Sequence, residues 1–168
     1  LKGSGKEYQS IVKAHRLPQV VIMAGGLGTR LGSMTKEVPK SLIEVNGKPI
    51  LSHILDWAQK QGCLNALVLT GHLGEAFDGF THPGMSVHFH KEPSPLGTGG
   101  ALWNAREMLE DQFILLWGDD LHPIDYHALV KRHIESEAPL TMTVTQNHDS
   151  MNLQHEKGRL QTYSKDSE

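Results

Sequence analysis

The sequence predicts an α/β fold in which a mostly parallel sheet is flanked by helices. From residue 19 onward, short apolar runs of strand character alternate with longer segments of helical period, as expected of parallel strands joined by helices. The 168-residue chain, with 38% hydrophobic residues, is long enough for one domain with a sizeable core. Several of the short runs are followed by glycine or acidic residues, which places polar loops at one edge of the predicted sheet.

Each element follows from the pattern of its residues. The run 19–24 is apolar and β-branched and leads into glycines, which predicts a strand. The segment 50–61 carries apolar residues at the helical period, and Pro49 stands at its start, where a missing N–H is harmless. The same criteria predict strands at 65–70, 85–90, 113–117 and 140–145, helices at 98–110 and 125–136, and a hairpin strand at 158–160.

The first residues stand apart from this pattern. Residues 1–18 are polar and pattern-poor, with Gly-Ser-Gly near their start and Pro18 at their end. We interpret them as a linker, an expression remnant or the tail of an upstream domain, and we assign the folded domain to residues 19–168.

Composition argues against several classes of protein. With a net charge of −3 and no basic cluster, the chain lacks the surface that a nucleic acid requires. No apolar run approaches the length of a membrane span, and the amino terminus lacks the apolar core of a signal peptide. We therefore expect no membrane partner and a cytoplasmic location. The single cysteine, Cys63, lies in an apolar stretch, which predicts a buried and inert thiol.

The segment after the first strand suits a phosphate. Glycines without Cβ atoms follow the buried run Val20–Met23, and they let backbone N–H groups approach an anion closely. Arg30 then offers a planar fork of donors, and Lys40, held after Pro39, adds a compact mobile charge. A tight turn with two solvated basic residues is the alternative, but the combination favours phosphate binding.

This segment resembles the signature of the nucleotide-sugar pyrophosphorylases, also called sugar-phosphate nucleotidyltransferases. It does not fit the GxGxxG or GxxxxGK[ST] patterns of other phosphate loops. The residues that match the family are Gly25, Gly26, Gly28, Thr29, Arg30, Leu31, Pro39 and Lys40. The resemblance implies the Rossmann-like nucleotide-diphospho-sugar transferase fold, with Arg30 and Lys40 as catalytic residues on the phosphates.

A second glycine-rich loop, Glu92–Ala101, follows the strand predicted at 85–90 and opens a helix whose free N–H groups could meet a base or a phosphate. Taken alone, the loop is equally well explained as an ordinary helix entry. Family members place their base-reading loop here, so the resemblance implies that Glu92 and Gly97 contact the base. An ionised carboxylate accepts from the donors of guanine or cytosine and suits uracil and thymine poorly.

The amino-acid sequence of this loop favours guanine. Residues 96–101, LGTGGA, are similar to those of heptose 1-phosphate and mannose 1-phosphate guanylyltransferases, whereas glucose 1-phosphate cytidylyltransferases usually carry Arg where Ala101 stands. The resemblance implies GTP as the favoured nucleotide, with CTP as the alternative.

An acidic pair, Asp119 and Asp120, follows the strand 113–117. A carboxylate there could hold Mg²⁺ on a triphosphate, although such a pair is more often a turn or a helix cap. The resemblance implies that Asp119 is the metal ligand and that Asp120 lies near the sugar or the ribose. The residues expected to bind the nucleotide are Ala24, Gly25, Gly26, Gly28, Thr29, Gly71, Glu92, Gly97, Thr98 and Asp120.

The resemblance implies transfer of a nucleotidyl group from a nucleoside triphosphate to a sugar 1-phosphate, with release of pyrophosphate. Two alternatives are a non-catalytic nucleotide or nucleotide-sugar binding domain that regulates a partner, and a cytidylyltransferase. Transfer to a molybdopterin cofactor fits the length but not the first loop.

The resemblance covers about residues 19–144 and then fades, before any matched sugar-binding segment or second metal carboxylate. We therefore interpret residues 19–168 as a nucleotidyltransferase domain that is incomplete at its C-terminus. An apolar stripe of Trp103, Met108 and Leu109 could face a second copy of the chain in a homo-oligomer, but core packing is its expected fate.

Overall fold

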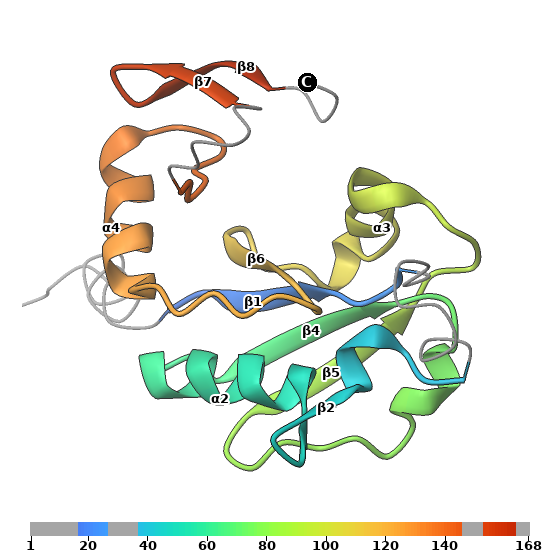
Figure 1. The fold of residues 1–168 in the computed structure, drawn as a ribbon. Helices are drawn as coiled ribbons and strands as arrows, with labels where there is room; N and C mark the ends of the chain where they lie inside the picture. Colours follow the sequence, from blue (N-terminus) through green and yellow to red (C-terminus); the bar gives the residue numbers. More distant parts are fainter. Residues whose placement is uncertain (1–16, 27–36, 146–152, 164–168) are drawn as a thin grey trace, which may run out of the picture. The chain divides into compact units, whose positions relative to one another are not determined.

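The computed structural model describes residues 17–26, 37–145 and 153–163 (Figure 1). Its internal contacts divide the chain into two units, residues 1–130 and 131–168, and each is described here by itself. The first unit contains a four-stranded sheet with helices on its faces. The second contains the end of a helix and a two-stranded hairpin.

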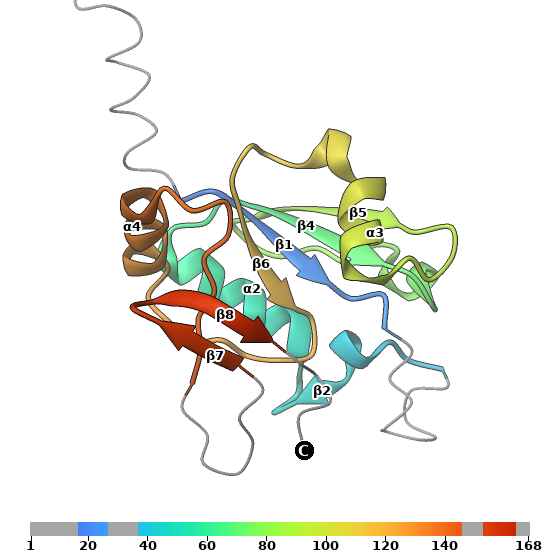
Figure 2. The same ribbon diagram turned by 90° about the horizontal axis from the view of Figure 1, so that it is seen from above.

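The sheet of the first unit consists of β1 (Gln19–Met23), β4 (Asn65–Thr70), β5 (Ser86–Lys91) and β6 (Phe113–Trp117). All four strands are parallel, and they lie in the order β5-β4-β1-β6 (Figures 1 and 2). The predicted parallel α/β fold is therefore confirmed. Each of these strands agrees with its prediction to within one residue at either end.

The register of the sheet brings the carboxyl ends of its strands to one edge. Met23, the last residue of β1, lies opposite Leu69 of β4 and Trp117 of β6. At the end of the neighbouring pair, Thr70 of β4 lies opposite Lys91 of β5. The loops that follow the four strands therefore start from the same edge, as the sequence pattern predicted.

Two helices cover opposite faces of the sheet (Figure 1). The side chains of β1 alternate between them: Val20 and Ile22 join the apolar cluster that contains α2 (Ile50–Gln61), whereas Val21 joins the cluster that contains α3 (Gly97–Asn104). This alternation is the strand period of two, and it leaves the middle of β1 fully buried. The predicted bounds of α2 are confirmed.

Shorter elements connect these layers. After β1, the chain forms the 3₁₀ turn η2 (Lys40–Leu42) and the hairpin of β2 (Glu44–Val45) and β3 (Lys48–Pro49). The two residues between the hairpin strands, Asn46 and Gly47, have φ angles of 53° and 73°, the left-handed values that a tight hairpin turn requires. The 3₁₀ turn η3 (Gly74–Phe77) follows β4.

Helix α4 (Tyr126–Ser136) begins in the first unit and ends in the second. In the second unit, β7 (Leu153–Glu156) and β8 (Arg159–Tyr163) form an antiparallel pair. The turn between them uses Lys157 and Gly158, both at positive φ. The hairpin strand predicted near residues 158–160 is therefore confirmed, whereas the strand predicted at 140–145 is not.

The prediction of a strand at 140–145 is wrong. These residues alternate apolar and polar side chains, but they form neither helix nor strand. Leu140, Met142 and Val144 are exposed by 70%, 46% and 59%, so the alternation has no buried face to stabilise it. A strand also needs a neighbour for its ladder of hydrogen bonds, and none pairs with this segment in the described part of the chain.

The helix predicted at 98–110 is shorter than expected. Helix α3 ends at Asn104, and the chain continues through the 3₁₀ turn η4 (Arg106–Met108). The side chain of Gln19 on β1 donates to the carbonyl of Met108 at 3.1 Å and accepts from the N–H of Glu110 at 3.2 Å. These bonds hold the turn that leads back to the sheet, and a continued helix would break them.

Three side chains test the predicted burial. Cys63 is fully buried, as predicted, and burial raises the pKa of its thiol to about 11, which disfavours the reactive thiolate. Trp103, expected in the core, is 71% exposed and stacks against the Arg106 guanidinium at 4.8 Å. Leu17 lies in the core cluster at 4% exposure, two residues before the first strand.

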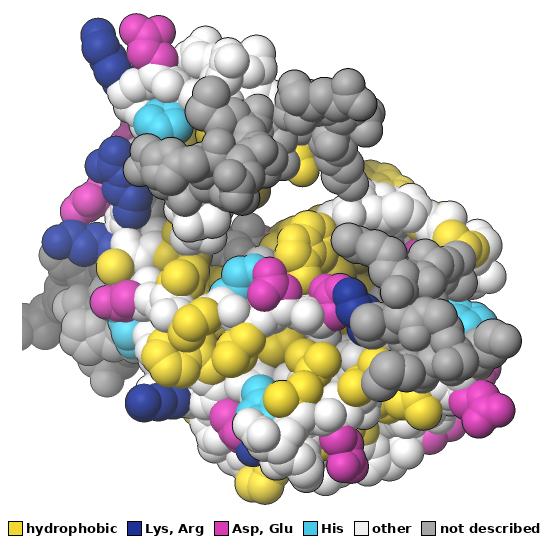
Figure 3. All heavy atoms as spheres, in the orientation of Figure 1, with side chains coloured by type: hydrophobic (Ala, Val, Ile, Leu, Met, Phe, Trp, Pro, Cys, Tyr) yellow, Lys and Arg dark blue, Asp and Glu magenta, His cyan; other side chains and the backbone are white. Residues whose placement is uncertain are grey.

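On the face shown in Figure 3, the Lys and Arg side chains of the described residues are interspersed with Asp and Glu. Within the described ranges, every helix is too short or too polar to cross a membrane.

Candidate nucleotide site

A cavity of about 420 Å³ opens at the carboxyl edge of the sheet. It is formed by the loops that follow β1, β5 and β6, together with η2 and the residue after Gly71. Eight of the residues predicted for the site line this cavity, namely Ala24, Gly25, Gly26, Lys40, Glu92, Gly97, Thr98 and Asp119. The sequence placed these residues in loops up to 95 positions apart (Ala24 to Asp119), and the fold brings them together.

Two backbone hydrogen bonds continue the pairing of the sheet strands into the loops that line the cavity. Ala24 N–H donates to the Leu69 carbonyl at 2.8 Å, and Gly118 N–H donates to the Met23 carbonyl at 2.9 Å. A Cβ atom at Gly118 would lie 2.9 Å from that carbonyl oxygen, so the two chains can approach this closely because residue 118 is a glycine. The approach sets Asp119 beside the first loop.

Two glycines make room for the carboxylate of Glu92. A Cβ atom at Gly25 would lie 2.8 Å from Glu92 Oε1, and a Cβ atom at Gly71 would lie 2.7 Å from the same oxygen. The other carboxylate oxygen, Oε2, accepts from the N–H of Leu96 at 3.2 Å. Glu92 is therefore held in a slot between two strand-exit glycines, with its carboxylate at the cavity.

The amino end of α3 forms another part of the wall. Gly97 opens the helix with a φ of 69°, a left-handed value that favours glycine. Among the described residues, no side chain caps this end of the helix, so the N–H groups of its first turn can donate to an anion or to the acceptor groups of a base. Gly97 and Thr98 both line the cavity.

Lys40 and Asp119 form an ion pair in the cavity. Lys40 Nζ donates to Asp119 Oδ2 at 2.5 Å, and the two side chains are 28% and 38% exposed. The pair joins η2 to the loop after β6, across 79 positions of sequence. Pro39 precedes the lysine, and its carbonyl accepts from Leu42 N–H at 2.9 Å, which fixes the turn that presents Lys40.

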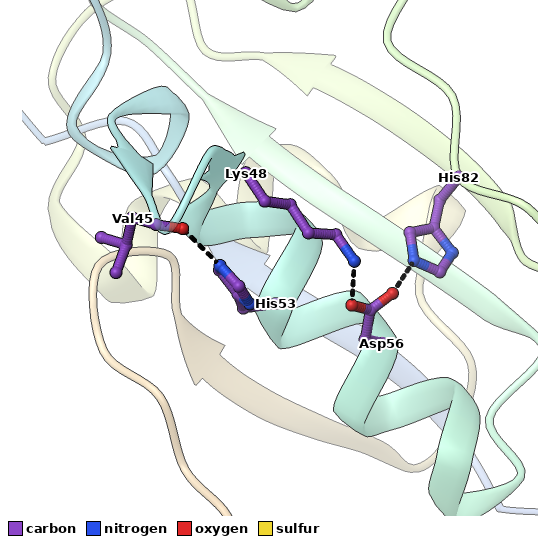
Figure 4. Close-up of polar contacts among 5 residues, drawn as sticks. All are labelled: Val45, Lys48, His53, Asp56 and His82. Atoms are coloured by element: carbon purple, nitrogen blue, oxygen red, sulfur yellow. Dashed lines mark hydrogen bonds and ion pairs between the residues drawn. The ribbon is translucent and has the colours of Figure 1, made fainter.

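A separate polar cluster supports the hairpin that follows Lys40 (Figure 4). Asp56 on α2 contacts Lys48 of β3 and accepts from His82 Nε2 at 2.9 Å. Burial raises the pKa of the Asp56 carboxyl, but hydrogen bonds from Lys48 and His82 outweigh it and hold the pKa below its ordinary value. On the same helix, His53 Nε2 lies 2.8 Å from the Val45 carbonyl of β2.

The remaining predicted site residues fall into two groups. Gly28, Thr29 and Arg30 lie outside the described residues, so their predicted roles are not addressed by this geometry. Gly71 lies behind Glu92 and shapes its slot. Asp120 lies in a turn, where its carboxylate is 3.4 Å from His122 Nε2, and it is not among the residues that line the cavity.

Several residues that line the cavity were not predicted as site residues. They are Met23, Ser41, His72, Pro95, Trp117 and Gly118. Trp117 and Gly118 precede the predicted metal ligand directly, so their position at a strand end was the signal that could have identified them. The hydroxyl of Ser41 is buried without a hydrogen-bond partner among the described residues.

Among the described residues that line this cavity, Asp119 and Glu92 carry the carboxylates, and Glu92 is the one already held by Leu96 N–H, which leaves Asp119 as the candidate ligand for a divalent cation. Hard oxygen donors suit Mg²⁺, which usually retains waters and binds through one or two carboxylates and the substrate phosphates. In the described ranges no three acidic, histidine or cysteine side chains gather into a metal cluster. The donor set therefore fits an ion that arrives on a triphosphate.

A family model described as nucleotidyl transferase matches residues 19–154. Because the match covers most of the sequence, the chain belongs to the nucleotidyl transferase family. The resemblance that the loop motifs indicated is thereby confirmed.

Two named relatives and one solved structure illustrate this membership. The chain is 35% identical over 130 residues to the D-glycero-alpha-D-manno-heptose 1-phosphate guanylyltransferase of Aneurinibacillus thermoaerophilus, covering 75% of this chain and 56% of that protein. It is 32% identical over 155 residues to the glucose-1-phosphate cytidylyltransferase of Salmonella typhimurium, covering 76% and 60%. The crystal structure of HddC from Yersinia pseudotuberculosis complexed with GMP-PN aligns with a TM-score of 0.64 and 31% identity, covering 71% and 55%. The chain thus spans about half the length of the relatives it matches.

Proposed function

We propose that this chain carries the nucleotide-binding part of a sugar 1-phosphate nucleotidyltransferase that favours GTP. The observation that supports it most is the convergence of three loops on one cavity: the glycine turn after β1, the Glu92 loop, and the loop that carries Asp119. Family membership supports the reaction class, and the solved relative with a guanine nucleotide analogue supports the base.

The base would be bound by the Glu92 loop. Guanine presents a ring N–H and an exocyclic amino group side by side, and an ionised carboxylate can accept from both. Glu92 Oε2 is partly engaged by Leu96, whereas Oε1 faces the slot between Gly25 and Gly71. The uncapped N–H groups of α3 would serve acceptor groups of the same nucleotide.

The phosphates would be bound by the glycine turn and by the basic residues. Gly25 and Gly26 line the cavity and allow close approach of an anion to the backbone. Lys40 would contact the α-phosphate or the incoming sugar phosphate, and Arg30 would hold the β and γ phosphates, as the family signature implies. A Mg²⁺ ion held by Asp119 would supply charge neutralisation on the phosphate oxygens.

The reaction requires little acid or base assistance from the protein. An oxygen of the sugar 1-phosphate attacks the α-phosphorus in line, a new P–O bond forms, and the bond to the bridging oxygen breaks to release pyrophosphate. A phosphate monoester is already nucleophilic, so the protein mainly brings two anions together and neutralises charge. Losing one such donor typically costs about 10²- to 10³-fold in turnover.

Calorimetric binding of GTP, CTP, UTP and dTTP, each with Mg²⁺, tests the proposal without a sugar phosphate. Selective GTP binding is the expected result, and sugar 1-phosphates would then be screened by pyrophosphate release. Absence of binding by all four nucleotides would contradict the proposal.

A cytidylyltransferase is the second candidate. The cytidylyltransferase relative aligns over a similar share of this chain, and the amino group of cytosine could also donate to Glu92. Preferential CTP binding in the same experiment would identify it. A regulatory domain without catalysis would instead bind nucleotide but release no pyrophosphate with any sugar phosphate.

The proposal also includes a cytoplasmic location, where nucleoside triphosphates are abundant. The exposed side chains of Trp103 and Met108 leave an apolar surface that a second copy of the chain could cover. Light scattering of the purified protein would test that oligomer.

A further inference from the structure

The Lys40–Asp119 pair joins two groups that the proposed reaction needs for other partners. In that reaction Asp119 holds a divalent cation, and Lys40 contacts a phosphate. In the structure the two groups contact each other instead: Lys40 Nζ donates to Asp119 Oδ2 at 2.5 Å. Each group therefore already has a partner of opposite charge.

In the described part of the cavity lining, few other charged side chains could replace either member of this pair. Among the described residues that line it, the remaining carboxylate is Glu92, and one of its oxygens is engaged by Leu96 N–H. The one other ionisable side chain there is His72. A free divalent cation at Asp119 would thus either lie beside the Lys40 ammonium or separate it from its carboxylate, and both are unfavourable in a partly buried site.

We propose that Lys40 keeps divalent cations off Asp119 until a nucleoside triphosphate arrives, so that metal and nucleotide bind as one unit. This inference rests on the proposed function, because it takes Asp119 as the metal ligand. When a metal–triphosphate complex enters, the ammonium moves to a phosphate oxygen and the carboxylate moves to the cation. Before and after this exchange, both charges would have a partner.

The partial exposure of the pair makes such an exchange feasible. A buried, fully desolvated pair would resist separation, whereas a pair exposed by 28% and 38% is screened by water and is correspondingly weak. Lys40 also sits in a short 3₁₀ turn on a long flexible side chain, so it can change partners without a change in the backbone.

The test measures Mn²⁺ binding to the full chain without nucleotide, by the electron paramagnetic resonance signal of free Mn²⁺. Lys40→Met, which keeps the length of the side chain and removes its charge, is expected to bind Mn²⁺ about fivefold more tightly than the wild type. The same variant is expected to bind Mg²⁺-GTP about tenfold more weakly, because a phosphate contact is lost. The two effects have opposite signs, which a general loss of folding would not produce.

Three further variants serve as controls. Lys40→Arg keeps the charge and should bind Mn²⁺ as weakly as the wild type. Lys131→Met removes an ammonium from the exposed pair with Glu135 on α4 and should change neither affinity. Adding Asp119→Asn to Lys40→Met should abolish the gain in Mn²⁺ affinity.

Equal Mn²⁺ affinity in the wild type and in Lys40→Met would overturn the inference, whatever the nucleotide result. A gain that survives Asp119→Asn would overturn it as well. Failure of the wild type to bind any nucleoside triphosphate would count against the proposed function, so the two failures are distinguishable.

Discussion

The two halves of the cavity differ in how their side chains are held. In the half that we assign to the base, Glu92 is fixed by Leu96 N–H and by the slot between Gly25 and Gly71. In the half that we assign to the phosphates, Lys40 and Asp119 are held by each other and remain partly exposed. The first half is ready for its ligand, whereas the second must exchange partners before it can bind one.

This difference gives the two halves different roles: the base half selects the nucleotide, and the phosphate half couples metal binding to triphosphate binding. A pre-positioned acceptor lowers the cost of binding the right base and penalises a base that leaves it unpaired. A pair that must exchange couples one ligand to another, because each new partner releases the group that the other needs. The same site can therefore select its nucleotide with one half and link metal to triphosphate with the other.

The largest effect is expected from closing the slot of the base half. In Gly71→Ala, the added Cβ would lie 2.7 Å from Glu92 Oε1 and 3.1 Å from the Gly25 carbonyl oxygen, so the carboxylate must move. Loss of a charge-assisted hydrogen bond to the base should weaken GTP binding by about 10- to 100-fold. Calorimetric titration with Mg²⁺-GTP measures this change.

Gly99→Ala is the matched control for this substitution. A Cβ atom at Gly99 meets nothing within 4 Å, and the residue lies within α3, where alanine favours helix by about 1 kcal/mol relative to glycine. GTP affinity should fall far less than in Gly71→Ala, because Glu92 keeps its slot, and the melting temperature should rise slightly. Similar affinity losses in both variants would contradict the slot.

A smaller effect is expected when the slot is kept and its charge is removed. Glu92→Gln retains one acceptor oxygen but places an amide N–H₂ beside the donors of guanine. The ratio of GTP to UTP affinity should fall by about tenfold. If competition titrations show an unchanged ratio, Glu92 does not read the base.

The phosphate half is expected to depend on the cluster that supports its hairpin. Asp56→Asn removes the negative charge and one of the two acceptor oxygens that Lys48 and His82 contact, and since the carboxylate is partly exposed, the free energy of unfolding should fall by about 0.5–1 kcal/mol at pH 7. Because the folded state lowers the pKa of Asp56, its stabilisation is present above the ordinary value of 3.8 and is lost as pH falls through the folded-state pKa.

Urea denaturation at pH 7 and below pH 3.8 distinguishes this explanation from a general packing defect. The difference between wild type and Asp56→Asn should shrink at the lower pH. An equal difference at both pH values would show that the ionised carboxylate is not what stabilises the hairpin.

The smallest effect is expected at Asp120. Its carboxylate lies 3.4 Å from His122 Nε2 and outside the cavity lining, so Asp120→Asn should leave GTP affinity within about twofold. Asp119→Asn, its neighbour, should lose the metal dependence of nucleotide binding. A large effect of Asp120→Asn would restore the ribose or sugar contact that the family resemblance implies.

Much of this fold follows from local sequence pattern. The strands of the sheet and α2 are long or strongly periodic, and their bounds agree with prediction to within one residue. The segment 140–145 has the same alternation as a strand but lacks a partner and a buried face, which the local pattern does not report. The early end of α3 depends on Gln19, more than 80 residues away, so the local sequence pattern could not predict it.

The site was predictable in its residues but not in its contacts. Loops after parallel strands meet at one edge, so the lining residues could be inferred from topology. The contact of Lys40 with Asp119, 79 positions apart, depends on side-chain geometry. The sequence also could not show why a glycine stands at position 71. A strand-exit glycine has the same sequence pattern whether or not a carboxylate from another loop fills the space beside it.

The position of β1 has a consequence for synthesis of the chain. It precedes the other three strands of this sheet along the chain and is one of its two interior strands, with Val20 opposite Ala66 on one side and Ile114 on the other. This mostly apolar strand must therefore wait for two partners, and closing such long loops slows folding. Until β6 is made, one edge of β1 has no partner in this sheet, and an unpaired strand edge favours aggregation.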